Sequence, residues 1–143
     1  MSEAPEPPMT AERVQAMLDG SSFIAFFGIK VVSVDPAGAT LVLAMELRPE
    51  LERRGGSGQW HGGALAGLID TAGDFAVALG LGAPVPTINF RVDYLRPAMT
   101  ARVEATARVR RAGRTVAVAD VDVHDAAGRL VAIGRGTYGT QPG

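Results

Sequence analysis

One stretch decides how this chain folds: Trp60-His61-Gly62-Gly63-Ala64-Leu65-Ala66-Gly67-Leu68-Ile69-Asp70. Its small and aliphatic residues favour a helix, which we predict over about Gly63–Leu79 and which ends before Gly80, Gly82 and Pro84. The glycines at its start permit a close approach of the backbone to another molecule. The first N–H groups of a helix have no partners within it, and they lie at the positive end of its dipole. These donors are suited to hold a carbonyl oxygen that becomes an oxyanion.

Asp70 is a carboxylate inside an otherwise apolar segment. Burial without a partner disfavours its ionised form, so its presence needs an explanation. One interpretation is a solvent-facing stripe shared with Asp74, four residues further on. The other is a ligand site, because the neighbours on that face are small: Gly63, Gly67, Thr71 and Gly73. If the two carboxylates lie close together, their repulsion would raise the pKa of one of them and strengthen it as a base.

The chain has 143 residues, of which 47% are apolar and 20% are charged. These values indicate one globular domain with a sizeable core. A formal net charge of −1, without a basic run, argues against nucleic-acid binding. No uncharged apolar stretch is long enough to span a membrane, so no membrane partner is expected. Residues 1–9 are acidic and proline-rich without an apolar signal core; we expect a disordered tail there, a single domain over 10–143 and a cytoplasmic protein.

Several kinds of chemistry lack the residues they require. The chain has no cysteine, which excludes disulfides, thiolate nucleophiles and cysteine metal sites. The two histidines, His61 and His124, are far apart in sequence and have no carboxylate cluster beside them, so we predict no bound metal. Ser57 lies in a glycine-rich loop without the spacing of a nucleophile elbow, so a serine triad is poorly supported.

Hydrophobic periodicity predicts the elements around the central helix. A short amphipathic helix begins at Thr10 and ends at about Leu18. β-Branched and aliphatic residues predict a hairpin of strands Ile29–Val34 and Thr40–Leu47. After the central helix, polar and apolar residues alternate in two half-buried strands, Thr87–Tyr94 and Arg102–Arg110. A third strand, Thr115–His124, and a fourth, Arg129–Tyr138, are joined by a turn at residues 125–128 and complete a four-strand meander. Six strands and one long helix favour an α+β domain in which an antiparallel sheet buries the helix against one face.

Three segments resemble the PaaI-like acyl-CoA thioesterases, and the resemblance covers about residues 25–140. His61–Ala72 is similar to the family signature H-G-G-x(6)-D-[TS]-A, Asn89–Ala98 to a strand that ends in Y-x-x-P-A, and Arg111–Thr115 to a basic hairpin before the next strand. A lone His-Gly-Gly would be weak, but the three segments in this order are specific. The resemblance implies the hotdog fold, a curved antiparallel β-sheet wrapped around a long central helix.

The resemblance also implies catalytic roles. The Gly62 N–H would polarise the thioester carbonyl, and Asp70 would act as a general base on water or as a nucleophile that forms an anhydride. Thr87 would orient the water or the acid across a dimer interface, unless it is an ordinary strand threonine. His61 would either shuttle a proton or fix the loop through a ring hydrogen bond.

Other residues are expected to hold the substrate. Arg96, Arg111 and Arg114 would meet the phosphates of coenzyme A at strand ends, unless they are solvated basic residues. Gln59 or Ser57 would replace an asparagine that many relatives carry before the His-Gly-Gly. The expected substrate-binding set also includes Gly63, Asp74, Tyr94 and Gly113.

The resemblance predicts an acyl-CoA thioesterase that hydrolyses an aryl- or medium-chain acyl-CoA and needs no cofactor apart from the coenzyme A of its substrate. Two alternatives stay open. A hotdog enoyl-CoA hydratase or dehydratase would need His61 paired with a carboxylate, and a non-catalytic acyl-CoA-binding module would not need Asp70. An apolar helix flank and a free sheet edge predict a homodimer with sites at its interface, and the family resemblance implies a dimer-of-dimers homotetramer.

Overall fold

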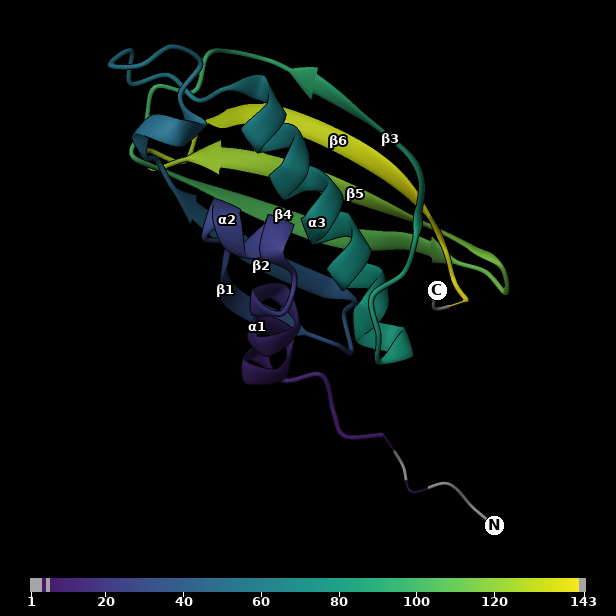
Figure 1. Cartoon of the computed structure of the whole chain (residues 1–143). Coiled ribbons are helices and arrows are strands. Elements are labelled where there is room, and N and C mark those ends of the chain that lie inside the picture. The colour runs from purple at the N-terminus through teal and green to yellow at the C-terminus, as the bar shows by residue number, and fades with distance from the viewer. Residues whose placement is uncertain (1–3, 5, 142–143) are drawn as a thin grey trace.

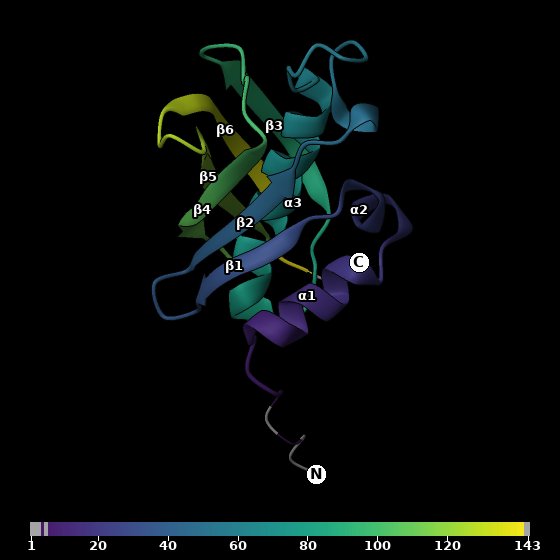
Figure 2. The same cartoon turned by 90° about the vertical axis from the view of Figure 1, so that its left-hand side faces the viewer.

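The structure is a computed structural model, and it describes Ala4 and residues 6–141. Its helices are α1 (Ala11–Asp19), α2 (Ser22–Phe27), the 3₁₀ turn η1 (Pro49–Leu51) and α3 (Gly62–Leu81). Its strands are β1 (Lys30–Asp35), β2 (Thr40–Glu46), β3 (Thr87–Tyr94), β4 (Arg102–Ala112), β5 (Val116–Asp125) and β6 (Leu130–Gly139). They form one antiparallel sheet in the order β1-β2-β4-β5-β6-β3. Figure 1 shows this sheet curving around α3, and Figure 2 shows α1 and α2 beside β1. The predicted α+β hotdog fold is confirmed.

α3 forms the centre of the core because it is apolar on nearly every side. Leu68, Ile69 and Ala72 have no exposed surface. The sheet approaches the helix closely, since a Cβ on Gly134 of β6 would lie only 2.5 Å from Ile69 Cγ2. α3 has the length and apolar composition of a membrane span, but it is mostly buried inside this fold. Its position in the core therefore explains its composition.

The end of α3 differs slightly from the prediction. The helix continues through Gly80 to Leu81, two residues past the predicted Leu79. Gly82 ends it, with a φ of 81° and an N–H that donates to the Ala78 carbonyl. A left-handed residue after the last turn is the usual way in which glycine ends a helix.

The position of β3 corrects the predicted four-strand meander. β4, β5 and β6 are consecutive neighbours, but β3 pairs with β6 and forms an edge of the sheet. β3 is also mostly exposed in one chain rather than half-buried, with Ile88 56% and Phe90 38% exposed. Alternation predicts the two faces of a strand but not its neighbour, because strand pairing depends on long-range contacts.

The N-terminal part of the chain contains a helix that periodicity misses. α2 is capped by Ser21, whose hydroxyl accepts a hydrogen bond from the Ile24 N–H at 3.3 Å. Before α1, Met9 is 5% exposed and packs in the core, so the packed part of the fold begins before Thr10. Of the expected tail, residues 1–3 and 5 lie outside the described residues.

Candidate active site

The start of α3 is held so that one backbone donor stays open. His61 is the N-cap, and its Nδ1 accepts a hydrogen bond from the Gly63 N–H at 2.8 Å. The His61 N–H donates to the Leu51 carbonyl at 2.8 Å, which ties the loop to η1. His61 thus makes the loop-fixing contact that was one of its two predicted roles, and the Gly63 N–H is not free for a ligand. Within the part of the chain that the structure describes, the Gly62 N–H has no acceptor.

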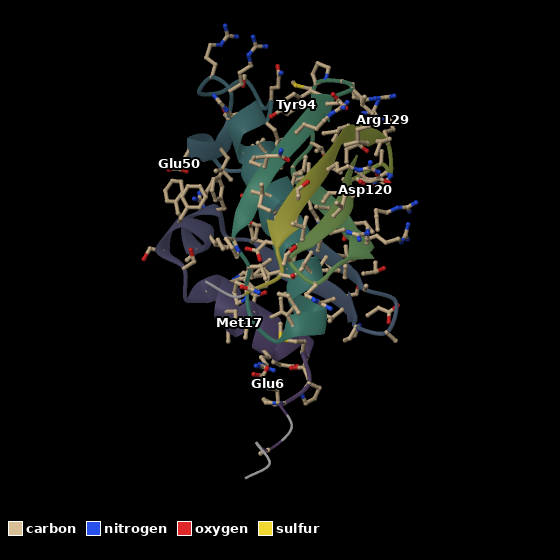
Figure 3. The ribbon with its side chains drawn as sticks, turned by 90° about the vertical axis from the view of Figure 1, so that its right-hand side faces the viewer. Glu6, Met17, Glu50, Tyr94, Asp120 and Arg129 are labelled. Atoms are coloured by element: carbon tan, nitrogen blue, oxygen red, sulfur yellow. The ribbon has the colours of Figure 1, made fainter. Side chains whose placement is uncertain are left out.

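A cleft of about 470 Å³ opens beside this N–H. Its walls include Gln59 and Gly62 on one side and Tyr94 and Arg96 on the other. The Tyr94 hydroxyl donates to the Gly62 carbonyl at 2.6 Å, and burial raises the pKa of this tyrosine. Figure 3 shows Tyr94 at the end of the molecule opposite Glu6. The structure therefore brings four of the predicted residues together, while Ser57 supports the loop by accepting the Gln59 N–H at 3.2 Å.

Asp70 lies two turns further along α3, and it does not line the Gly62 cleft. The Thr87 hydroxyl donates to Asp70 Oδ1 at 2.8 Å within the same chain. Thr87 thus reaches the acid of its own chain, and its action across a dimer interface stays a prediction. The Tyr138 hydroxyl donates to the main-chain oxygen of Asp70 at 3.1 Å. Burial raises the pKa of the Asp70 carboxyl, and hydrogen bonding from Thr87 and Tyr138 lowers it in part.

Asp74 is the second half-buried carboxylate on α3, so a fully solvent-facing stripe is not what the structure shows. The Val85 N–H donates to Asp74 Oδ1 at 2.8 Å, which anchors the segment between α3 and β3. Burial raises the pKa of Asp74 to about 7, and the charge of Asp70 adds to this effect. The predicted repulsion is present, but burial is the larger cause. Asp74 binds its own chain here and does not line the Gly62 cleft.

Small residues near Asp70 make room for side chains of the protein itself. A Cβ on Gly67 would lie 3.2 Å from the Phe27 ring. A Cβ on Gly73 would lie 2.1 Å from the Tyr138 hydroxyl oxygen. The prediction that these two glycines leave space for a ligand is therefore wrong.

The three arginines predicted to meet coenzyme A do not gather in one chain. Arg96 follows β3, and its N–H donates to a carbonyl near the start of β6 at 3.4 Å. Arg111 and Arg114 belong to the β4–β5 hairpin. The hydroxyl of Thr140, the residue after β6, donates to the Arg114 carbonyl, so this hairpin lies near the end of β6. The two groups lie at opposite ends of the sheet (Figure 1). Gly113 shapes that hairpin through its N–H to the Val116 carbonyl and is likewise distant from the Gly62 cleft.

Two residues that hydrogen-bond to the aspartates of α3 were not predicted: Tyr138, which donates to the Asp70 main-chain oxygen, and Val85, which donates to the Asp74 carboxylate. In the sequence, Tyr138 looks like an ordinary aromatic residue of a strand. The one pattern that could have indicated its contact with α3 is the pair of glycines at alternate positions before it, Gly134 and Gly136. Glycines on one face of a strand indicate a close approach of another element. Over Ala4 and residues 6–141, no three histidine, aspartate or glutamate side chains gather in a way that could hold a metal ion.

A curved sheet around one helix, with an open N–H at the helix start and a hydrogen-bonded carboxylate further along, has the architecture of a hotdog thioesterase. Residues 57–132 match the family model of the Thioesterase superfamily. The chain is 37% identical over 139 residues to a candidate esterase of Halobacterium salinarum, with 90% of each chain covered. A solved structure from the thioesterase superfamily has a TM-score of 0.84 at 38% identity, covering 90% of this chain and 96% of the other.

A further relative is the acyl-coenzyme A thioesterase PaaI of Escherichia coli, which is 28% identical and covers 87% of this chain and 86% of its own. The solved structure of E. coli PaaI, from the phenylacetic acid degradation operon, has a TM-score of 0.77 and covers 90% of both chains. The chain therefore belongs to the thioesterase superfamily, as a PaaI-like thioester hydrolase.

Proposed function

We propose that the protein hydrolyses acyl-CoA thioesters to a free acid and coenzyme A, with the Gly62 N–H and Asp70 as its catalytic groups. The observation that carries this proposal is the half-buried Asp70 carboxylate, which Thr87 holds at 2.8 Å in a family of thioester hydrolases. That the PaaI relative is named an acyl-coenzyme A thioesterase supports acyl-CoA as the substrate class.

The reaction needs few groups because a thioester is weakly stabilised by resonance and its thiolate leaves readily. The Gly62 N–H, at the positive end of the helix dipole, would stabilise negative charge on the carbonyl oxygen. Asp70 would take a proton from the water that attacks the carbonyl carbon. Alternatively, its oxygen would attack that carbon and form an anhydride, which water then hydrolyses. In both routes the carbon–sulfur bond breaks and coenzyme A leaves, so no other cofactor is required.

One chain alone does not bring the two groups to the same thioester. Asp70 is eight positions after Gly62, which corresponds to about 12 Å along an α-helix. The short Asp70 side chain, tied to Thr87, does not close that distance. Catalytic groups must lie within hydrogen-bond reach of the reacting atoms. The site therefore forms between two copies of the chain, with Gly62 from one and Asp70 from the other.

The free edge of the sheet supports such a dimer. β3 is an edge strand with unpaired backbone groups along one side. Thr87, which binds Asp70, begins this strand, and Tyr94, which binds Gly62, ends it. Antiparallel pairing of β3 with β3 of a second copy would bring the Asp70 end of one chain beside the Gly62 end of the other. The same pairing would bring the β4–β5 hairpin of one chain toward Arg96 of its partner, where the arginines could share the phosphates of coenzyme A.

The test is release of free thiol from a panel of aryl and straight-chain acyl-CoA thioesters by the wild type and by Asp70→Asn. We expect Asp70→Asn to lower kcat by about 10³-fold. Asp122→Asn, which changes an exposed aspartate on β5, is the matched control and should retain full activity. Equal activity of wild type and Asp70→Asn would refute the proposal, and the panel itself decides between aryl and medium-chain substrates.

Adding an enoyl-CoA to the panel, and measuring acyl-CoA binding beside thiol release, separates the alternative functions. Hydration of an enoyl-CoA without release of thiol would indicate a hydratase. Binding of acyl-CoA without either reaction would indicate a binding module.

A further inference from the structure

A buried tyrosine lies against the turn of α3 that carries Asp70. Tyr138 has no exposed surface, and its hydroxyl donates to the Asp70 main-chain oxygen at 3.1 Å. Asp70 lies inside α3, where its carbonyl already accepts the N–H of the residue four positions on. The hydroxyl is therefore not needed to satisfy a carbonyl that would otherwise lack a partner.

Two glycines on different elements create the space for this hydroxyl. A Cβ on Gly73 of α3 would lie 2.1 Å from the hydroxyl oxygen, and a Cβ on Gly136 of β6 would lie 2.2 Å from it. Glycine weakens both helices and strands relative to residues with side chains. The chain thus accepts a less favourable residue at two places, and both places admit the end of the same side chain.

Tyr138 is also in register with the other hydroxyl that binds Asp70. Tyr138 of β6 pairs with Thr87 of β3, next to an irregularity in the strand pairing between Thr87 and Asn89. Such a bulge changes the direction of nearby side chains. The Tyr138 hydroxyl lies close enough to the Asp70 carboxylate to lower its pKa. Two hydroxyls from neighbouring strands therefore hold one aspartate, Thr87 through its carboxylate and Tyr138 through its main-chain oxygen.

The groups around this carboxylate come from three elements: Thr87 of β3, Tyr138 of β6 and Asp74 of α3. Burial and the charges of Asp70 and Asp74 raise the pKa of Tyr138. The tyrosine therefore keeps its proton and remains a donor at every pH at which the enzyme would work.

We propose that Tyr138 is a positioning residue: its hydroxyl holds Asp70 in place through the Asp70 main-chain oxygen, while Thr87 holds the Asp70 carboxylate. This inference rests on the proposed function, in which Asp70 is the reacting carboxylate. Tyr138 acts through Asp70, and it has no place in the Gly62 cleft.

The test is Tyr138→Phe, which removes the hydroxyl and keeps the ring. We expect kcat to fall about tenfold and the acid limb of its pH profile to move up by roughly one pH unit, since Asp70 loses the hydroxyl that holds its turn of α3 and lowers its pKa. KM should change little. Thr137→Val is the control, because this neighbour on β6 pairs with Asn89 and faces the other side of the sheet. Its acid limb should match the wild type.

A second readout does not depend on turnover. In protein labelled with ¹³C at the aspartate carboxyl groups, and with Asp70→Asn used to assign the signal, the Asp70 titration should move up in Tyr138→Phe. If Tyr138→Phe does not fold, Tyr138→3-fluorotyrosine retains ring and hydroxyl but donates more strongly, and the Asp70 titration should move down.

An unchanged Asp70 titration in the folded variant would overturn the inference. The wild type could release no coenzyme A while the Asp70 titration still moved up in Tyr138→Phe. In that case the proposed function would be refuted, but the positioning of Asp70 by Tyr138 would be supported.

Discussion

Replacing Asp74 by asparagine should stabilise the protein above neutral pH. Burial, with a smaller contribution from the charge of Asp70, raises the pKa of Asp74 from 3.8 to about 7. A carboxyl whose pKa is higher in the folded state favours folding while it is protonated. This contribution is complete below the unfolded pKa and is lost as the pH rises through the folded value. The rise corresponds to about 4 kcal/mol at most, which partial exposure of Asp74 reduces to ~2 kcal/mol.

The assay is urea unfolding of the wild type and Asp74→Asn between about pH 4 and pH 8, at one protein concentration. Trp60 is the single tryptophan and is buried, so its fluorescence reports unfolding. We expect similar stabilities near pH 4 and an advantage of ~2 kcal/mol for Asp74→Asn at pH 8. Asparagine keeps an oxygen that can accept the Val85 N–H, so the substitution preserves this hydrogen bond and removes only the titratable charge. If both proteins showed the same dependence on pH, the reasoning about Asp74 would be refuted.

Three further substitutions test separate contacts. Thr87→Val removes the hydroxyl that donates to Asp70, and we expect kcat to fall about tenfold and the acid limb to move to higher pH; a wild-type profile would contradict this role. His61→Ala removes the N-cap of α3 and should cost about 1 kcal/mol in urea unfolding, whereas an unchanged midpoint would exclude a capping contribution. Gly134→Ala places a Cβ 2.5 Å from Ile69 Cγ2 and should cost ~2 kcal/mol, so wild-type stability would show that helix and sheet are less closely packed.

The part of the site that lies in one continuous segment was predictable from the sequence. His61, Gly62 and Asp70 belong to the stretch that starts α3, and the glycines and the helical propensity of that stretch are local properties. Thr87 could be assigned to the acid only through the family resemblance, and the structure places its hydroxyl 2.8 Å from Asp70 Oδ1.

The parts that escaped prediction depend on contacts between distant segments. β3 follows α3 in sequence, yet it pairs with β6, and periodicity carries no information about this choice. Tyr138 lies 68 residues after Asp70, so its contact appears only once β6 is placed against α3. The glycines near Asp70 could be interpreted as space for a ligand, but Phe27 and Tyr138 occupy that space. Arg96 and Arg114 show the same limit, because their positions along the chain do not reveal that they lie at opposite ends of the sheet.

Two variants are suited to test whether two copies share each site. Gly62→Pro removes the N–H at the first position of α3, where proline is tolerated, and His61 before it is already extended with φ −68° and ψ 135°. Gly62→Ala is the steric control, because it places a Cβ 3.1 Å from Tyr94 but keeps the N–H. Asp70→Asn removes the carboxylate. We expect Gly62→Pro and Asp70→Asn each to be nearly inactive, and Gly62→Ala to keep more activity than Gly62→Pro.

The decisive measurement is the thioesterase activity of Gly62→Pro and Asp70→Asn refolded together in equal amounts. In a dimer that shares its sites, about half of the molecules are mixed and each mixed dimer has one intact site, so we expect about a quarter of the wild-type activity. If Gly62 and Asp70 act within one chain, every site carries a defect. The mixture would then stay as inactive as the separate variants, and the two-copy site would be contradicted.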